Sequence, residues 1–138
     1  MVRRALGTSA LLVVVSIAGG QAQEPDTKAA QAAADSWLSL IDAADYVKSW
    51  DESATFFKNA ITSEKWQAAV KAARGAFGAL KSRAVKTATP ATKLPGAPEG
   101  EYIVFDFDAI FQQKPAAERV TVVRDKDGAW RVVGYFVK

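Results

Sequence analysis

Two aspartates in the second half of the chain have the type and spacing of an acid–base pair. Asp106 and Asp108 stand two residues apart between Glu101 and Phe111, so in a β-strand they would share one face with α-carbons about 6.5–7 Å apart. Paired carboxylates at such distances divide general acid and base roles in glycosidases. We favour the alternative of a solvated sheet face, because cross-strand charge pairs are common in antiparallel sheets. The arginines expected on neighbouring strands are Arg119, Arg124 and Arg131.

A second candidate is the dipeptide Asp45-Tyr46, and a third is the acidic run from Asp125 to Gly128. A carboxylate beside a phenol at a pocket mouth can transfer protons, as some isomerases require. We favour a simpler interpretation, in which Asp45 caps a helix and Tyr46 lies at the edge of the core. The run from Asp125 to Gly128 resembles a fragment of a calcium loop, but it lacks the third acidic position and the terminal glutamate. Its Asp-Gly ending instead predicts a β-hairpin turn.

Composition excludes most familiar catalytic sites. The sequence contains no cysteine and no histidine, so it offers neither a triad with a histidine base nor the usual ligands of zinc, copper and haem. It also lacks the Ser-x-x-Lys motif and the glycine patterns of nucleotide-binding loops. We therefore predict no catalytic residue, no metal and no cofactor. A modest basic cluster could contact an anionic lipid or polymer, although we favour a solvated surface; it comprises Lys81, Arg83, Lys86 and Lys93.

The spacing of apolar residues predicts the elements that would position these side chains. Helical periodicity indicates a first helix from Asp26 or Thr27 to Ala44, a second from Asp45 to Phe57 and a third from Ser63 to Leu80. From Ser82 the period changes to two, which predicts strands over 84–93, 101–111, 118–124 and 129–137, the first of them an edge strand interrupted by Pro90. This order predicts an α+β fold: three N-terminal helices packed on one face of a three- to four-stranded antiparallel sheet, in a single domain spanning residues 23–138.

Large aromatic side chains recur on the faces expected to point inward. Trp37, Trp50 and Trp66 lie on the helical stripes, and Trp130 lies on the last strand. We interpret them as core residues, since an aromatic side chain buries about 150–250 Å². The alternative is a ligand-binding pocket between the helices and the sheet. Its expected lining residues are Trp37, Tyr46, Trp50, Phe105 and Tyr135.

The first 22 residues have the three-part layout of a secretory signal peptide. Arg3 and Arg4 form a positive start, the segment 5–18 is apolar and uncharged, and small residues precede a predicted cut after Ala22. The apolar segment is shorter than the roughly 20 residues that span a bilayer, so we expect no stable membrane span after cleavage. The sequence therefore predicts a periplasmic or secreted protein.

Cleavage also changes the charge of the chain. It removes two of the 18 basic residues and leaves 16 against 15 acidic ones, a net charge of +1. A domain this close to neutral has little electrostatic attraction for nucleic acid, which we do not expect as a partner. An exported protein without cysteine has no disulfide framework, so packing must hold the fold together.

A series of motifs runs along the chain in order: the segment from Asp35 to Tyr46, Ser49-Trp50, Trp66, 80–83, 94–102 and the ending 127–136. Together they resemble an exported bacterial family described only as domain of unknown function 4019. The resemblance covers essentially the whole mature chain and implies no activity, because none is established for that family. The element order and the step at 43–46 are also similar to nuclear transport factor 2-like proteins, which implies helices over a curved sheet with a pocket between them.

These observations favour an exported, non-catalytic binding or protein-interaction module of the cell envelope, with a small apolar ligand or an envelope protein as its partner. Two alternatives stay open: a small-molecule pocket domain of the nuclear transport factor 2-like type, and a metal-free enzyme that transfers protons through Asp and Tyr. A homodimer is a further expectation, because the outer sheet face would carry apolar side chains. These are Tyr102, Val104, Ile110, Val133 and Tyr135.

Overall fold

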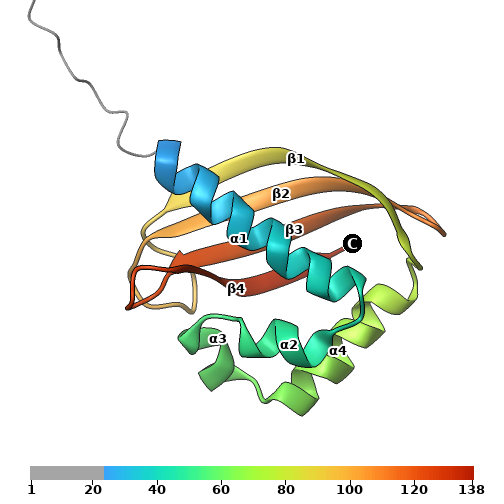
Figure 1. The fold of residues 1–138 in the computed structure, drawn as a ribbon, viewed down its shortest axis with the longest axis horizontal. Coiled ribbons are helices and arrows are strands. Elements are labelled where there is room, and N and C mark those ends of the chain that lie inside the picture. The colour runs from blue at the N-terminus through green and yellow to red at the C-terminus, as the bar shows by residue number, and fades with distance from the viewer. Residues whose placement is uncertain (1–23) are drawn as a thin grey trace, which may run out of the picture.

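The computed structural model describes residues 24–138, and the expected signal peptide, residues 1–22, lies outside the described residues. In the described part of the chain, the helices are α1 (Glu24–Asp42), α2 (Tyr46–Asp51), α3 (Thr55–Ala60) and α4 (Ser63–Gly75). The strands that follow are β1 (Leu80–Ala91), β2 (Tyr102–Phe111), β3 (Pro115–Arg124) and β4 (Trp130–Val137). They form one antiparallel sheet in the order β1-β2-β3-β4 (Figure 1). The predicted α+β class is confirmed.

The second expected helix is divided into α2 and α3 by a turn at Ser53 and Ala54. The backbone of Ala54 is extended, with φ −60° and ψ 152°, and its N–H donates to the carbonyl oxygen of Val132 in β4 at 2.8 Å. This bond ties the turn to the sheet, and it requires the backbone to leave the helical conformation. Because the apolar spacing continues through Phe57, the sequence alone did not reveal the break.

The third expected helix ends at Gly75 rather than at Leu80. Gly78 then adopts a φ of +75°, a left-handed conformation that glycine reaches without steric cost. A β-carbon at this position would lie 3.2 Å from the Cβ of Gln112, so glycine also allows the close approach of the β2–β3 turn. Phe77, which helical spacing had assigned to the third helix, instead packs with Phe111 at one end of the sheet.

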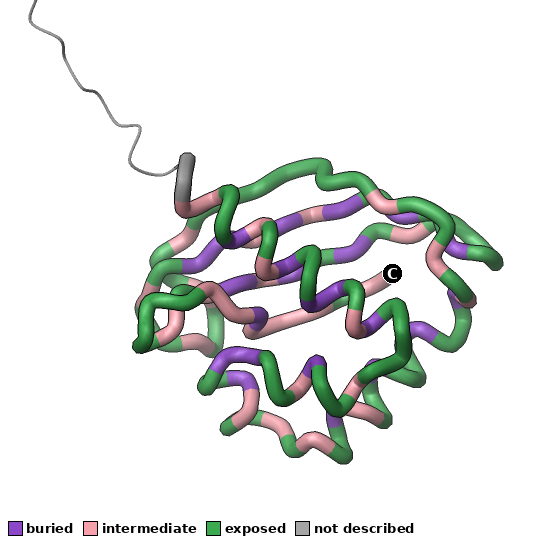
Figure 2. Tube along the Cα trace, in the orientation of Figure 1, coloured by how far each residue is buried: buried purple, intermediate pink, exposed green. Residues whose placement is uncertain are grey.

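The helices form one layer over the sheet. Helix α1 lies across β2, β3 and β4, and the other helices continue the layer beside β4 (Figure 1). None of the β1 residues is buried, and Figure 2 shows this strand exposed along most of its length. No helix within residues 24–138 is long and apolar enough to cross a membrane. The helix layer therefore covers three strands and leaves β1 largely open to solvent.

The aromatic core is as the spacing predicted. Trp37 and Trp66 are buried, and Trp50 and Trp130 are half-buried and pack against the same core. Each buried indole N–H finds an acceptor, as burial of this group requires: Trp37 Nε1 donates to the carbonyl oxygen of Ser49 at 2.9 Å, and Trp66 Nε1 donates to the Ser49 hydroxyl at 3.0 Å. The indoles thus explain why Ser49, a polar residue of α2, is buried.

A β-bulge in β4 changes which face its last residues occupy. Val132 pairs with Val122, but Gly134 rather than Val133 pairs with Thr121, so one extra residue is inserted into the strand. Beyond the bulge the alternation is reversed, and Tyr135 packs against the core on the helix side, as does Val133. The expected placement of Tyr135 and Val133 on the outer sheet face is therefore wrong. Tyr102, another expected outer-face residue, is buried.

Candidate functional site

The five aromatic residues predicted to line a pocket surround one core. Trp37 and Phe105 are 2 % and 0 % exposed, whereas Tyr46, Trp50 and Tyr135 pack against that core from its edge. The rings of Trp37 and Tyr135 are in contact, with centroids 5.5 Å apart. These side chains occupy the space between the helices and the sheet, so Trp37 and Phe105 present almost no surface to a ligand.

The predicted aspartate pair on β2 is divided between two environments. Asp106 faces Arg119 of β3, with Oδ1 2.8 Å from Nε, and accepts a further bond from the Thr87 hydroxyl at 3.2 Å. The hydrogen bond from Arg119 holds the pKa of Asp106 below its usual value, while Asp108 is exposed. This arrangement is the cross-strand charge pair that we favoured over an acid–base site.

The two other acidic motifs have local structural roles. Asp45 caps α2, where its Oδ1 accepts a bond from the Lys48 N–H at 3.3 Å. The run from Asp125 to Gly128 forms the β3–β4 hairpin turn, with Gly128 at φ +84°. In that turn, Asp127 is paired with Arg131 at 2.7 Å. Within residues 24–138, no three potential metal ligands come together.

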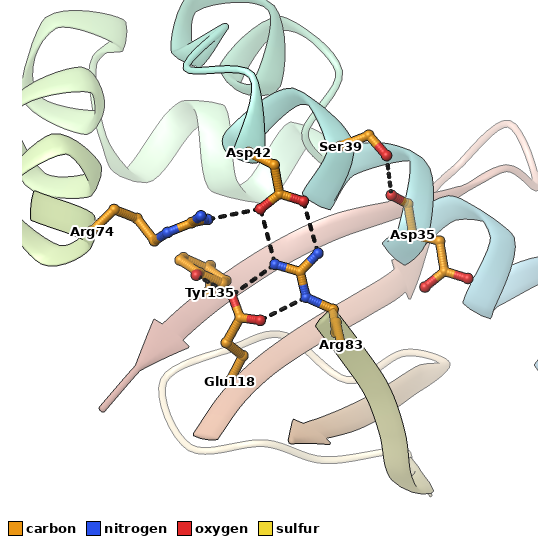
Figure 3. A network of polar contacts seen from close by, with 7 residues as sticks. All are labelled: Asp35, Ser39, Asp42, Arg74, Arg83, Glu118 and Tyr135. Atoms are coloured by element: carbon orange, nitrogen blue, oxygen red, sulfur yellow. Dashed lines mark hydrogen bonds and ion pairs between the residues drawn. The ribbon is translucent and has the colours of Figure 1, made fainter. Parts of the chain in front are cut away.

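The structure brings together a charge network that the sequence analysis missed (Figure 3). At its centre, Arg83 of β1 bridges α1 and β3. Its Nε donates to Glu118 Oε1 at 2.6 Å, and its Nη1 and Nη2 donate to the two carboxylate oxygens of Asp42 at 2.8 and 2.9 Å. The side chains of Arg83 and Glu118 are only 12 % and 0 % exposed. Arg83 therefore does not belong to a basic surface cluster, although its position near Lys81 and Lys86 in the sequence suggested that it would.

Two further side chains complete this network. Arg74 of α4 donates from Nη1 to Asp42 Oδ1 at 3.1 Å, and its guanidinium carbon lies 4.6 Å from the centre of the Phe111 ring. Tyr135 of β4 donates its hydroxyl proton to Glu118 Oε2 at 2.5 Å. The five residues come from α1, α4, β1, β3 and β4, so the network joins the helix layer to the sheet.

Two members of the network, Tyr135 and Arg83, have shifted pKa values. Burial, followed by the negative charge of Glu118, raises the pKa of Tyr135 far above its usual value. Burial alone would lower the pKa of Arg83, but its bonds to Asp42 and Glu118 outweigh that effect and raise it. The phenol therefore stays protonated and the guanidinium stays charged at physiological pH. Neither the phenol nor the guanidinium exchanges a proton near neutral pH. The contacts of these two groups hold elements of the fold together.

One sequence signal could have revealed the network. Glu118 alternates with Val120 and Val122 along β3, so a strand that buries the two valines also buries the glutamate. A buried carboxylate needs a cationic partner. The strand pattern thus predicts that an arginine lies nearby, but it does not say which one.

The opposite end of α1 borders a hollow of about 460 Å³. Its floor is largely apolar, and its rim carries two carboxylates, Asp26 of the first turn of α1 and Glu101, the residue before β2. The residues around it are Asp26, Thr27, Pro90, Ala91, Thr92, Glu101, Tyr102, Ile103 and Trp130. Trp130 was expected in the core, and the sequence carries no local mark of this hollow, because the hollow forms where three strand ends meet a helix.

Arg124 lies between the two rim carboxylates and makes only long contacts with each. Its Nη1 is 3.5 Å from Asp26 Oδ2 and 3.3 Å from Glu101 Oε2, and its guanidinium carbon is 5.9 Å from the centre of the Trp130 ring. The side chains of Arg124, Asp26 and Glu101 are 40 %, 43 % and 62 % exposed. These contacts are long and solvated, so a ligand could replace them at small cost.

Comparison with protein families gives a match. The family model described as "Protein of unknown function (DUF4019)" matches residues 33–135. This range contains all five residues of the charge network, whereas Asp26 at the rim of the hollow precedes it. No curated protein matches the chain.

Proposed function

Since the chain belongs to the DUF4019 family, whose description assigns no activity, we propose a function from the structure: an exported, non-catalytic domain that binds a small ligand at the hollow beside the N-terminal end of α1. The observation that carries this proposal is the contrast between the two ends of that helix. The carboxylate oxygens at one end all accept hydrogen bonds from within the network, and the charged groups at the other end are exposed around an apolar floor.

The charge network supports the non-catalytic part of the proposal. General acid–base catalysis needs a group that gains and loses a proton near the working pH. Tyr135 is held in its protonated form and Arg83 in its charged form, and every carboxylate oxygen of Glu118 and Asp42 accepts at least one hydrogen bond from within the network. The network is therefore better suited to fixing the fold than to turning over a substrate.

The hollow supports the binding part. Ligand pockets are mostly apolar clefts of about 300–1,000 Å³ with a few polar groups that fix orientation, and the hollow of about 460 Å³ falls in this range. Tyr102 forms part of its wall, and the Tyr102 hydroxyl donates to the carbonyl oxygen of Pro98 at 2.5 Å. That bond holds the loop between β1 and β2 in place, so the wall is preformed.

Export is proposed from the sequence of the first 22 residues. A cut after Ala22 would leave α1, which begins at Glu24, intact in the mature chain. The test is the mass of the protein recovered from the periplasm of a producing cell. A mass equal to residues 23–138 supports export and cleavage, and retention of the leader in the cytoplasm would overturn them.

The binding proposal is tested by native mass spectrometry of the mature protein recovered from the same cells. We expect an added mass of a few hundred daltons, retained by Phe136→Ala and reduced in Trp130→Ala. Phe136 is the matched control, since it is an exposed aromatic residue outside the hollow. Because Trp130 also packs against the core, Ala91→Trp serves as a second variant that fills the hollow without removing a core contact.

Two results would overturn the proposed function. One is a bare mass for the wild-type protein together with no thermal stabilisation by any member of a library of small amphiphilic molecules. The other is an enzymatic turnover that persists through purification and is lost in a single aspartate or tyrosine variant. Asp35→Asn is the first variant to examine, since the pKa of Asp35 is raised. Partial burial raises this pKa by more than the positive charge of Arg83 lowers it.

A further inference from the structure

We propose that the hollow at the N-terminal end of α1 binds an organic cation with an apolar body, such as an alkyl- or arylammonium. The inference rests on the proposed function and names the ligand class for that site. It follows from three features of the rim and floor: an excess of negative charge, an aromatic ring within reach of that charge, and an apolar surface beneath both.

The first feature is the charge balance of the rim. Asp26 and Glu101 line the hollow, and the guanidinium shared between them is that of Arg124. Two carboxylates facing one guanidinium leave an excess of one negative charge. The two contacts, at 3.5 and 3.3 Å, are longer than the 2.7–2.9 Å of a well-formed bond between a cationic nitrogen and a carboxylate oxygen. The carboxylates thus retain the capacity to accept bonds from a second cation.

The second feature is the ring of Trp130. Cations are attracted to the face of a tryptophan when they lie within about 6 Å of its centre. The guanidinium carbon of Arg124 lies at 5.9 Å, which is the outer limit of that range. The ring therefore already faces a cation of the protein itself, and a ligand cation that enters the hollow can approach it more closely. A tryptophan face beside carboxylates is suited to ammonium and guanidinium groups.

The third feature is the floor, which sets the rest of the ligand. Pro90 and Ala91 of β1 and Ile103 of β2 line the hollow with aliphatic side chains. Burying an apolar group there is favourable by about 25 cal/mol per Å². A fully hydrated inorganic cation gains nothing from such a floor. The floor therefore favours a cation that carries a hydrocarbon portion.

Arg124 gives the proposal a distinctive consequence. If a ligand cation uses Asp26 and Glu101, it competes with Arg124 for the same oxygens. Removing the guanidinium while keeping a polar side chain, in Arg124→Gln, should then strengthen binding of the cation. If the hollow instead binds an anion through Arg124, the same substitution weakens binding. The sign of the change therefore identifies the charge of the ligand.

The experiment titrates the mature protein, residues 23–138, with three probes of similar shape: 2-phenylethylammonium, 2-phenylethanol and 3-phenylpropionate. Binding is followed through the indole N–H signal of Trp130 in nuclear magnetic resonance spectra, which Trp130→Phe assigns. We expect the cation to bind more tightly than the alcohol and the anion. Arg124→Gln should strengthen cation binding, and Glu101→Gln should weaken it, each by about two- to fivefold, the range of an exposed ion pair.

Asp108→Asn is the matched control. It removes one carboxylate, as Glu101→Gln does, but from an exposed position on the outer face of β2, so its affinity for the cation should equal that of the wild type. An equal affinity for the cation and the alcohol, unchanged by Arg124→Gln, would overturn the inference while leaving a binding site. A preference for 3-phenylpropionate that Arg124→Gln abolishes would overturn it in favour of an anion site. Failure of all three probes, with a bare native mass, would instead overturn the proposed function.

Discussion

The two ends of helix α1 carry the same arrangement of charges in two different environments. At each end an arginine from the sheet lies between a carboxylate of α1 and a second carboxylate, which comes from β3 at one end and from the residue before β2 at the other. At the C-terminal end, Arg83 bonds Asp42 and Glu118 at 2.6–3.1 Å, and its side chain is 12 % exposed. At the N-terminal end, Arg124 contacts Asp26 and Glu101 at 3.5 and 3.3 Å, and its side chain is 40 % exposed.

Burial explains why the same types of side chain have different roles at the two ends of α1. A charge removed from water costs several kcal/mol, so every buried ion must be matched by a partner at short distance. An exposed charge is already solvated, and its ion pair contributes only about 0.2–1 kcal/mol. The buried set therefore has one arrangement and fixes the fold. The exposed set can exchange partners, which is what a binding site requires.

Replacing each arginine in turn should give the largest difference between the two ends of α1. In Arg83→Met, Asp42 keeps Arg74, but Glu118 keeps only the Tyr135 hydroxyl. A buried charge left without its cation costs about 3–5 kcal/mol, so we expect a loss of this size in the free energy of unfolding by urea. Arg124→Met should lose less than about 1 kcal/mol. Equal losses in the two variants would contradict the assigned roles.

A smaller difference is expected between the phenols of Tyr135 and Tyr102. Tyr135→Phe removes a hydrogen bond to a charged acceptor, worth about 1.5–3 kcal/mol, whereas Tyr102→Phe removes one to a neutral carbonyl, worth about 0.5–1.5 kcal/mol. Urea unfolding at neutral pH measures both. A larger loss in Tyr102→Phe would show that the Tyr135–Glu118 bond does not stabilise the network.

The same phenol predicts a dependence on alkaline pH. Because the folded-state pKa of Tyr135 is raised, its contribution to stability is complete below the unfolded-state pKa of about 10 and is lost progressively as the pH rises above it. The free energy of unfolding should therefore fall more steeply between about pH 9 and pH 11 in the wild type than in Tyr135→Phe. Lysines titrate in both proteins and cancel in the difference. Parallel curves would contradict this prediction.

The smallest expected effect is the response to salt. Raising the ionic strength from about 0.05 to about 1 M shortens the screening length to about 3 Å and weakens exposed pairs, while buried pairs are screened much less. The stability difference between the wild type and Arg124→Met should shrink towards zero, and that of Arg83→Met should persist. Urea unfolding at the two salt concentrations measures both. Loss of the Arg83→Met difference at high salt would show that this network is solvated.

Much of the fold could be predicted from periodicity alone. The alternation of Ile103, Phe105 and Phe107 identified the inward face of β2, and all three are buried. The Asp-Gly sequence at 127–128 identified the hairpin, since glycine reaches the required positive φ without strain. These features follow from the local chain, because neighbouring residues alone set their backbone conformation and the spacing of their side chains.

The breaks in periodicity could not be predicted in the same way. The bulge that turns Tyr135 inward adds one residue to β4, and the alternation of the sequence carries no mark of it. The division between α2 and α3 depends on a hydrogen bond from Ala54 to Val132, which are far apart in the sequence. Both features are set by partners that the local pattern does not contain.

The sequence by itself determined the class of fold, the inward faces of its helices and strands, and the exclusion of histidine and cysteine chemistry, because these depend on residue types and short spacings. Only the tertiary structure decided which charges meet. Arg83 is separated from Asp42 by 41 positions along the chain and from Glu118 by 35, and the three come together because packing the helix layer on the sheet removes most of the water around them. The same packing stops short of the rim at Asp26 and Glu101, where the charges stay exposed and a ligand can reach them.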